Sequence, residues 1–146
     1  MGLFDKILGG GSSITLSKPE AFAGVMLATI AADGNISDEE AAGFNAVISR
    51  MRIFQAQTAA EHRAMIDKLF GILNRSNSEQ LLAKAAESLP TELREAAFAV
   101  VTDLIFADSS VEDSERVMLE KLQSHLGISD DLALQIVQVM EIKNRN

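Results

Sequence analysis

The chain of 146 residues is long enough for one domain with a single core, and its apolar side chains are mainly Ala, Leu, Ile and Met, which favour helix. Its net charge of −8 repels phosphate backbones, so we expect no nucleic-acid partner and favour cations or a basic protein surface as partners. The absence of cysteine excludes disulfides, thiolate metal sites and cysteine nucleophiles, and no apolar run is long enough for a transmembrane segment. These features favour a cytoplasmic protein.

Residues 1–16 are expected to form a short leader that precedes a helical domain of residues 17–146. Phe4, Ile7 and Leu8 share one helical face, and three glycines at 9–11 then interrupt the helix. Two interpretations stay open. The leader packs on the domain, or it docks weakly to a membrane surface or to a partner.

Seven helices are predicted in the domain. Capping-box patterns, in which a Ser, Thr or Asn precedes Glu or Gln by three residues, mark four helix starts at 17–20, 37–40, 58–61 and 77–80. The other three helices begin at Pro90, after the turn at 108–111, and at Ser129, with Gly127 as a C-terminal cap of the sixth. In the third helix, core spacing is predicted for Met65, Ile66, Leu69, Phe70 and Leu73. Short connections favour an antiparallel bundle.

One acidic motif occurs twice, at a constant offset of 75 residues. The segment 27–40 aligns with 102–115, so that Asp33 falls on Asp108, Ile36 on Val111 and Glu40 on Glu115. In both copies an apolar helix ends in Ala-Asp, a small polar turn follows, and an acidic helix start comes next. The duplication predicts an all-α, single-domain bundle with an internal pseudo-two-fold repeat.

The acids of this motif have two explanations. Nine of the chain's 21 acidic residues lie at 33–40 and 103–115, where no basic residue occurs. Carboxylates in the first turn of a helix stabilise it through the helix dipole and the free backbone N–H groups, which accounts for most of them. Asp33 and Asp108 instead close a helix at its negative end, where capping does not explain a carboxylate. A bound hard cation would offset the unfavourable interaction of both carboxylates with the helix dipole.

Oxygen ligands of this kind suit Ca²⁺, before Mg²⁺ or Mn²⁺. An EF-hand is excluded because Asp38 stands where its loop requires glycine and Phe44 where it requires glutamate. The candidate metal ligands therefore belong to a site of another geometry. They are Asp33, Glu40, Asp108 and Glu115, with a second tier of Asn35, Asp38, Glu112 and Asp113.

The same residues resemble the tellurite-resistance protein TerB and its TerB-like relatives. The resemblance rests on the opening MGLFDKILG, on AADGNISDEE at 31–40 and on FADSSVEDSE at 106–115, and it spans nearly the whole chain. It implies a seven-helix domain of a bacterial, non-enzymatic stress-response protein whose acidic signature positions bind metal. The second copy departs from the pattern, with Ser109 in place of the usual glycine.

Other chemistries have little support in the sequence. His62 and His125 each stand alone in a helix, and no nucleophile elbow, phosphate loop or dinucleotide fingerprint occurs, so we expect no enzyme. Two functions remain. One is a TerB-like protein that binds a divalent cation and acts through a protein partner, with a peripheral position at the inner membrane face as an option. The other is a metal-free interaction module whose acidic face docks a basic partner.

Overall fold

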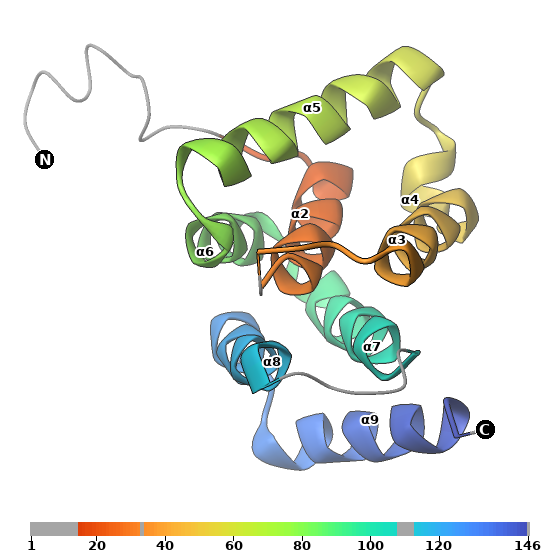
Figure 1. The fold of residues 1–146 in the computed structure, drawn as a ribbon, viewed down its shortest axis with the longest axis vertical. Helices are drawn as coiled ribbons and strands as arrows, with labels where there is room; N and C mark the ends of the chain where they lie inside the picture. The colour runs from red at the N-terminus through yellow and green to blue at the C-terminus, as the bar shows by residue number, and fades with distance from the viewer. Residues whose placement is uncertain (1–14, 33, 108–112, 146) are drawn as a thin grey trace, which may run out of the picture.

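The computed structural model of the protein describes residues 15–32, 34–107 and 113–145. Within these ranges the chain forms helices and no strands, which confirms the predicted all-α class (Figure 1). The helices are α2 (Lys18–Ile30), α3 (Asp38–Arg50), α4 (Arg52–Gln55), α5 (Ala59–Arg75), α6 (Ser78–Ser88), α7 (Thr91–Ala107), α8 (Asp113–Leu126) and α9 (Asp130–Lys143). None of these helices is both long and apolar enough to cross a membrane.

The predicted helix starts agree with the structure because the capping signals are local. Reciprocal capping boxes form at Ser17, Ser37 and Thr58. The Asn77 side chain accepts a hydrogen bond from the backbone N–H of Gln80, but the return bond of a capping box is absent from that cap. Gly127 closes α8 as predicted, with φ of +68° and with the neighbouring N–H groups directed back to the carbonyls of the last turn.

One helix of the described part was missed. The single turn α4 lies between the second and third predicted helices, where the sequence patterns predict no helix. Met51 adopts an extended conformation that ends α3, and α4 then brings Phe54 into the core. The ring of Phe54 meets Phe22 of α2 edge to face, with the centroids 6.2 Å apart. A four-residue turn has no periodicity of its own, so the count of seven helices was one too low for the described residues.

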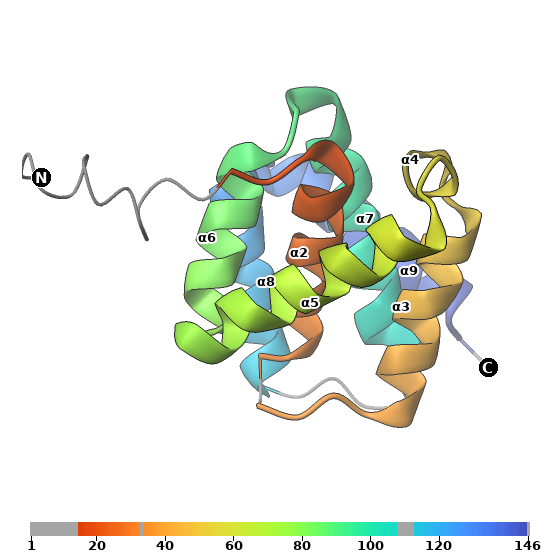
Figure 2. The ribbon, with the colours of Figure 1, turned by 90° about the horizontal axis from the view of Figure 1, so that it is seen from above.

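Helix α2 lies at the centre of the molecule and forms the core of the fold. Every residue from Ala21 to Ile30 is buried, and α5, α6, α7 and α8 pack around them (Figures 1 and 2). A Cβ atom added at Gly24 would lie 3.0 Å from the Cβ of Ala85, so glycine allows α2 and α6 to approach closely. The turn of the first acidic motif therefore begins at the end of a fully buried stretch of helix.

Candidate functional site

The first acidic motif is a tight turn between α2 and α3. The N–H of Gly34 donates to the carbonyl of Ala31 at 3.0 Å, and Gly34 adopts a φ of +88°, a conformation that favours glycine. Ile36 is half-buried and packs against the core, so it anchors the turn. Asp33, the residue of greatest interest in this motif, lies outside the described residues.

Glu40 combines a capping role with burial. The backbone N–H of Ser37 donates to Oε1 of Glu40 at 2.9 Å, and the N–H of Glu40 donates to Oγ of Ser37 at 3.0 Å. The side chain is nevertheless only 8% exposed, whereas Glu61 forms the same capping box on α5 and is exposed. Glutamate is seldom this buried, and the burial is a tertiary feature that the capping pattern does not contain.

The second motif also has a buried glutamate in the first turn of a helix. Helix α7 ends at Ala107, α8 begins at Asp113, and Glu115 is 3% exposed. The predicted ligands Asp108 and Glu112 lie outside the described residues. Glu40 and Glu115 therefore occupy the third position of helices that begin 75 residues apart, and both are buried.

Buried positions on α2 and α7 coincide at several points of the same 75-residue offset. Six pairs are buried in both helices: Phe22 and Ala97, Ala23 and Phe98, Met26 and Val101, Leu27 and Thr102, Thr29 and Leu104, and Ile30 and Ile105. Helix α2 packs against α7 and α8, while α7 packs against α2 and α3. As a result the described flanks of both turns lie on the same side of the molecule, at the bottom of Figure 2.

The remaining described candidates are at the surface. Asp38, Glu39 and Asp113 are exposed, and none of them forms an ion pair with a basic side chain of the described residues. Asn35 is also exposed and has an interaction within the protein. Asp103, counted above with the second acidic segment, is neutralised by α9, because Lys143 Nζ and Asn144 Nδ2 bond its carboxylate at 3.1 and 2.8 Å. Sequence reasoning missed this long-range pair.

Only part of the predicted set of metal ligands lies within the described residues. Within the described ranges, no three Asp, Glu or His side chains lie close enough together to hold a metal ion. Three of the predicted ligands, Asp33, Asp108 and Glu112, lie outside those ranges. His62 is half-buried beside a groove between α3 and α5, and His125 is exposed on α8.

Sequence reasoning also missed the grooves of the molecule. One lies between α3 and α5, and another lies among α7, α8 and α9. Phe70 was predicted as a core residue but is 36% exposed at the edge of the first groove, because α5 buries the neighbouring face that carries Met65, Leu69 and Ile72. An exposed phenylalanine has no local signal that separates it from a core one.

Comparison with known proteins adds no family assignment. No family model matches the chain, and neither a curated protein nor a solved structure matches it significantly. The resemblance to TerB-like proteins remains a prediction.

Proposed function

We propose that this chain is a non-enzymatic, TerB-like stress-response protein that binds a divalent cation at its duplicated acidic turns and acts through a protein partner. The observation that carries the proposal is the matched burial of Glu40 and Glu115 at the third position of two helices that start 75 residues apart. A carboxylate is costly to bury, so its presence at both positions favours a shared role.

The proposal extends to the symmetry of the domain. The hairpins α2–α3 and α7–α8 would be related by a pseudo-two-fold axis, with α2 against α7 near that axis. The reciprocal packing of α2 on α8 and of α7 on α3 supports this relation. Such symmetry would place the two turns on one side of the molecule, where their acids could serve a common cation site or two equivalent ones.

The predicted ligands would have different roles that depend on their positions in the two motifs. Asp33 and Asp108 would supply the first ligands, because each follows the last turn of a helix, where a carboxylate is otherwise unfavourable. Glu40 and Glu115 would assist from the following helix, and Asp38 and Asp113 would strengthen the negative field from the surface. Ca²⁺ fits this all-oxygen donor set before Mg²⁺ or Mn²⁺ because it accepts irregular coordination more readily. Tellurite is an anion, and the same field would repel it.

Calorimetric titration tests the cation proposal directly. The wild type should bind one of Ca²⁺, Mg²⁺ or Mn²⁺ saturably at pH 7, and the Asp33→Asn/Asp108→Asn double variant should lose that binding. A Glu87→Gln/Asp131→Asn variant removes two exposed acids elsewhere, so it reduces the net negative charge by the same amount and should bind as the wild type does. Absence of saturable binding to the wild type would refute the proposal.

A metal-free docking module is the second candidate, favoured by the exposed acids Asp38, Glu39 and Asp113, which lack ion-pair partners in the described structure. Their charge suits a basic protein surface, including one held at the cytoplasmic face of a membrane. In this case EDTA and added Ca²⁺ should leave the melting temperature unchanged, and partner capture should weaken as salt rises. A melting temperature that rises with Ca²⁺ would instead favour the cation site.

A further inference from the structure

A groove between α3 and α5 exposes apolar side chains on the helix that the start of the described chain contacts. It has a volume of about 370 Å³, and its apolar lining is Leu27, Ile30, Ile36, Phe44, Ile66 and Phe70. A second hollow of about 450 Å³ adjoins it, shares Asn45, His62 and Arg63, and continues to Phe54. Together the hollows follow α5 from Thr58 to Phe70, a length of about 18 Å at 1.5 Å per residue.

The composition of this groove suits a short amphipathic segment. Leu27, Ile30 and Phe44 are buried at its base, while Phe70 is 36% exposed at its edge. The rim carries one base and one acid, Arg63 and Asp67, both exposed. An apolar floor with a charged rim is the surface that a helix with one apolar face covers.

The leader of this chain has an amphipathic sequence that complements the groove between α3 and α5. Phe4, Ile7 and Leu8 fall on one face at helical spacing, Leu3 lies beside that face, and Asp5 and Lys6 lie away from it. The leader therefore offers an acid for Arg63 and a base for Asp67, together with apolar side chains for the floor. Six residues at 9–14, three of them glycine, separate Leu8 from the described chain.

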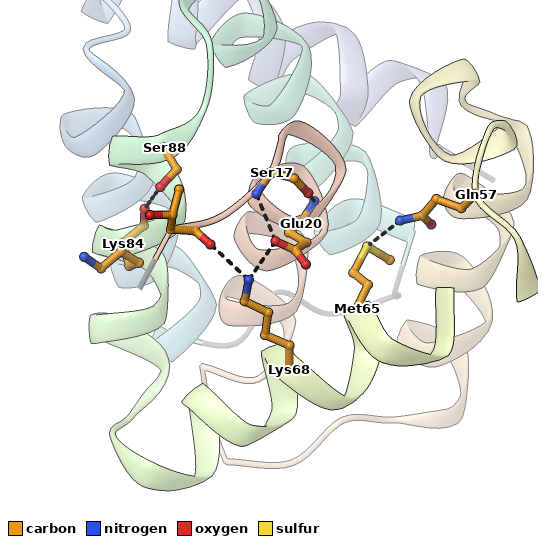
Figure 3. Close-up of polar contacts among 8 residues, drawn as sticks. Ser17, Glu20, Gln57, Met65, Lys68, Lys84 and Ser88 are labelled. Atoms are coloured by element: carbon orange, nitrogen blue, oxygen red, sulfur yellow. Dashed lines mark hydrogen bonds and ion pairs between the residues drawn. The ribbon is translucent and has the colours of Figure 1, made fainter. Parts of the chain in front are cut away.

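The described chain starts on the helix that forms one wall of the groove. Lys68 of α5 donates to the carbonyl oxygen of Thr15 at 2.9 Å and to Oε1 of Glu20 at 3.0 Å. Figure 3 shows the ammonium group of Lys68 reaching the start of α2 beside Ser17 and Glu20. This contact fixes the point from which the leader departs.

The linker is long enough to reach the groove from that point. Lys68 and Phe70 lie on different sides of α5, so the chain must cross the outer face of a helix about 10–12 Å wide. The seven steps from Leu8 to Thr15 span up to about 23 Å when extended. The outer face of α5 carries the small residues Ala60, Ala64 and Gly71, which leave room for a chain to cross closely. The other groove, among α7, α8 and α9, has no wall from α5.

We propose that residues 3–8 dock as an amphipathic segment into the groove between α3 and α5 of the same chain, with Phe4, Ile7 and Leu8 against Phe44, Ile66 and Phe70. This inference is independent of the cation proposal, because none of these residues is a predicted metal ligand. A linker of only six residues keeps the leader at an effective concentration of about the millimolar range, so a contact that is weak between separate molecules becomes substantially occupied within one chain.

The absence of cysteine from the chain allows a direct test by disulfide trapping. In the full-length protein, Leu8→Cys is paired with Phe70→Cys at the groove. The matched control pairs Leu8→Cys with Leu134→Cys, which replaces an exposed residue, 56% accessible, at the edge of the other groove. Disulfide formation is measured in a glutathione redox buffer, with peptide mapping of the monomeric product. The Phe70 pair should form with an effective concentration at least about tenfold above the control.

A second measurement identifies the occupant without a disulfide. A nitroxide attached to Asp5→Cys should broaden the amide signals of Phe44 and Ile66, and the added change Phe70→Glu should abolish that broadening. Equal trapping at Phe70 and Leu134, or no broadening at Phe44 and Ile66, would overturn the proposal. So would trapped products that are mainly dimers, which would assign the groove to a second copy. Binding of the leader to vesicles of phosphatidylcholine and phosphatidylglycerol, without trapping at Phe70 in their absence, would assign the leader to a membrane and also overturn it.

Discussion

Substitution of Glu40 separates its role in the helix cap from a role in cation binding. Glu40→Gln keeps an oxygen that accepts from the N–H of Ser37, because Gln also serves in capping boxes. The variant loses only the interaction of the negative charge with the start of α3, about 0.3–1 kcal/mol. Cation binding should nevertheless weaken, because an amide is a poorer ligand for Ca²⁺ than a carboxylate.

Glu40→Ala removes the cap as well. The hydrogen bond with Ser37 contributes about 0.5–1.5 kcal/mol, and loss of the buried methylene next to the carboxylate adds about 0.8 kcal/mol. The free energy of unfolding should therefore fall by about 2 kcal/mol. Glu61→Ala is the matched control, because Glu61 forms the same box with Thr58 but is exposed, so only the cap is lost, at about 1 kcal/mol.

Urea unfolding at pH 7 in EDTA measures these stabilities, and calorimetric titration of the same variants measures cation binding. The expected order of stability is wild type, Glu40→Gln, then Glu40→Ala. If Glu40→Gln is as unstable as Glu40→Ala in EDTA, the charge of Glu40 and not its capping hydrogen bond supplies the stabilisation, contrary to this expectation. If Glu40→Gln binds cations as tightly as the wild type, Glu40 is not a ligand.

Three further predictions concern the framework of the site. Gly24→Ala should destabilise the protein by about 1 kcal/mol, because the new Cβ would lie 3.0 Å from the Cβ of Ala85 on α6. Gly71→Ala should stabilise the protein by about 0.5–1 kcal/mol, because its new Cβ meets only the end of a flexible side chain. Thermal unfolding measures both changes. Phe54→Ala should lower the free energy of unfolding by about 3–5 kcal/mol in urea titration, because Phe54 is buried edge to face on α2. Burial raises the pKa of Glu20, but the N–H of Ser17 and the ammonium of Lys68 outweigh burial and hold the pKa below 4.5. The resulting stabilisation is complete above that pH and is lost as the pH falls through the lowered pKa. Lowering the pH from 6 to 3 should therefore reduce the free energy of unfolding, measured in urea, more in the wild type than in Glu20→Gln.

The helices were predictable because their signals are local. A capping box needs four consecutive residues, and the boxes at Ser17, Ser37 and Thr58 formed as the sequence indicates. The core of α2 was predictable for a related reason, since Phe22, Met26 and Ile30 stand at helical spacing in a segment with few polar residues.

Features that depend on contacts between distant segments were not predictable from these patterns. The short helix α4 places the ring of Phe54 against Phe22, which lies 32 residues earlier in the sequence. In the sequence Asp103 belongs to a segment of acids with no basic residue, yet Lys143 of α9 forms an ion pair with its carboxylate. The groove beside Phe70 arises from the separation of α3 and α5, and no periodicity within either helix specifies that separation.

The contrast between Glu40 and Glu61 defines what the candidate site adds to local chemistry. Both close a capping box with the same two hydrogen bonds, but Glu61 remains in solvent while Glu40 is buried where α3 begins near α7. The cap alone does not require burial, since Glu61 forms it without burial. The buried position is therefore a property of the turn's place in the fold, and it recurs at Glu115 in the second copy. A buried carboxylate keeps little freedom to move, and burial at both turns favours a fixed polar role over a general acidic surface.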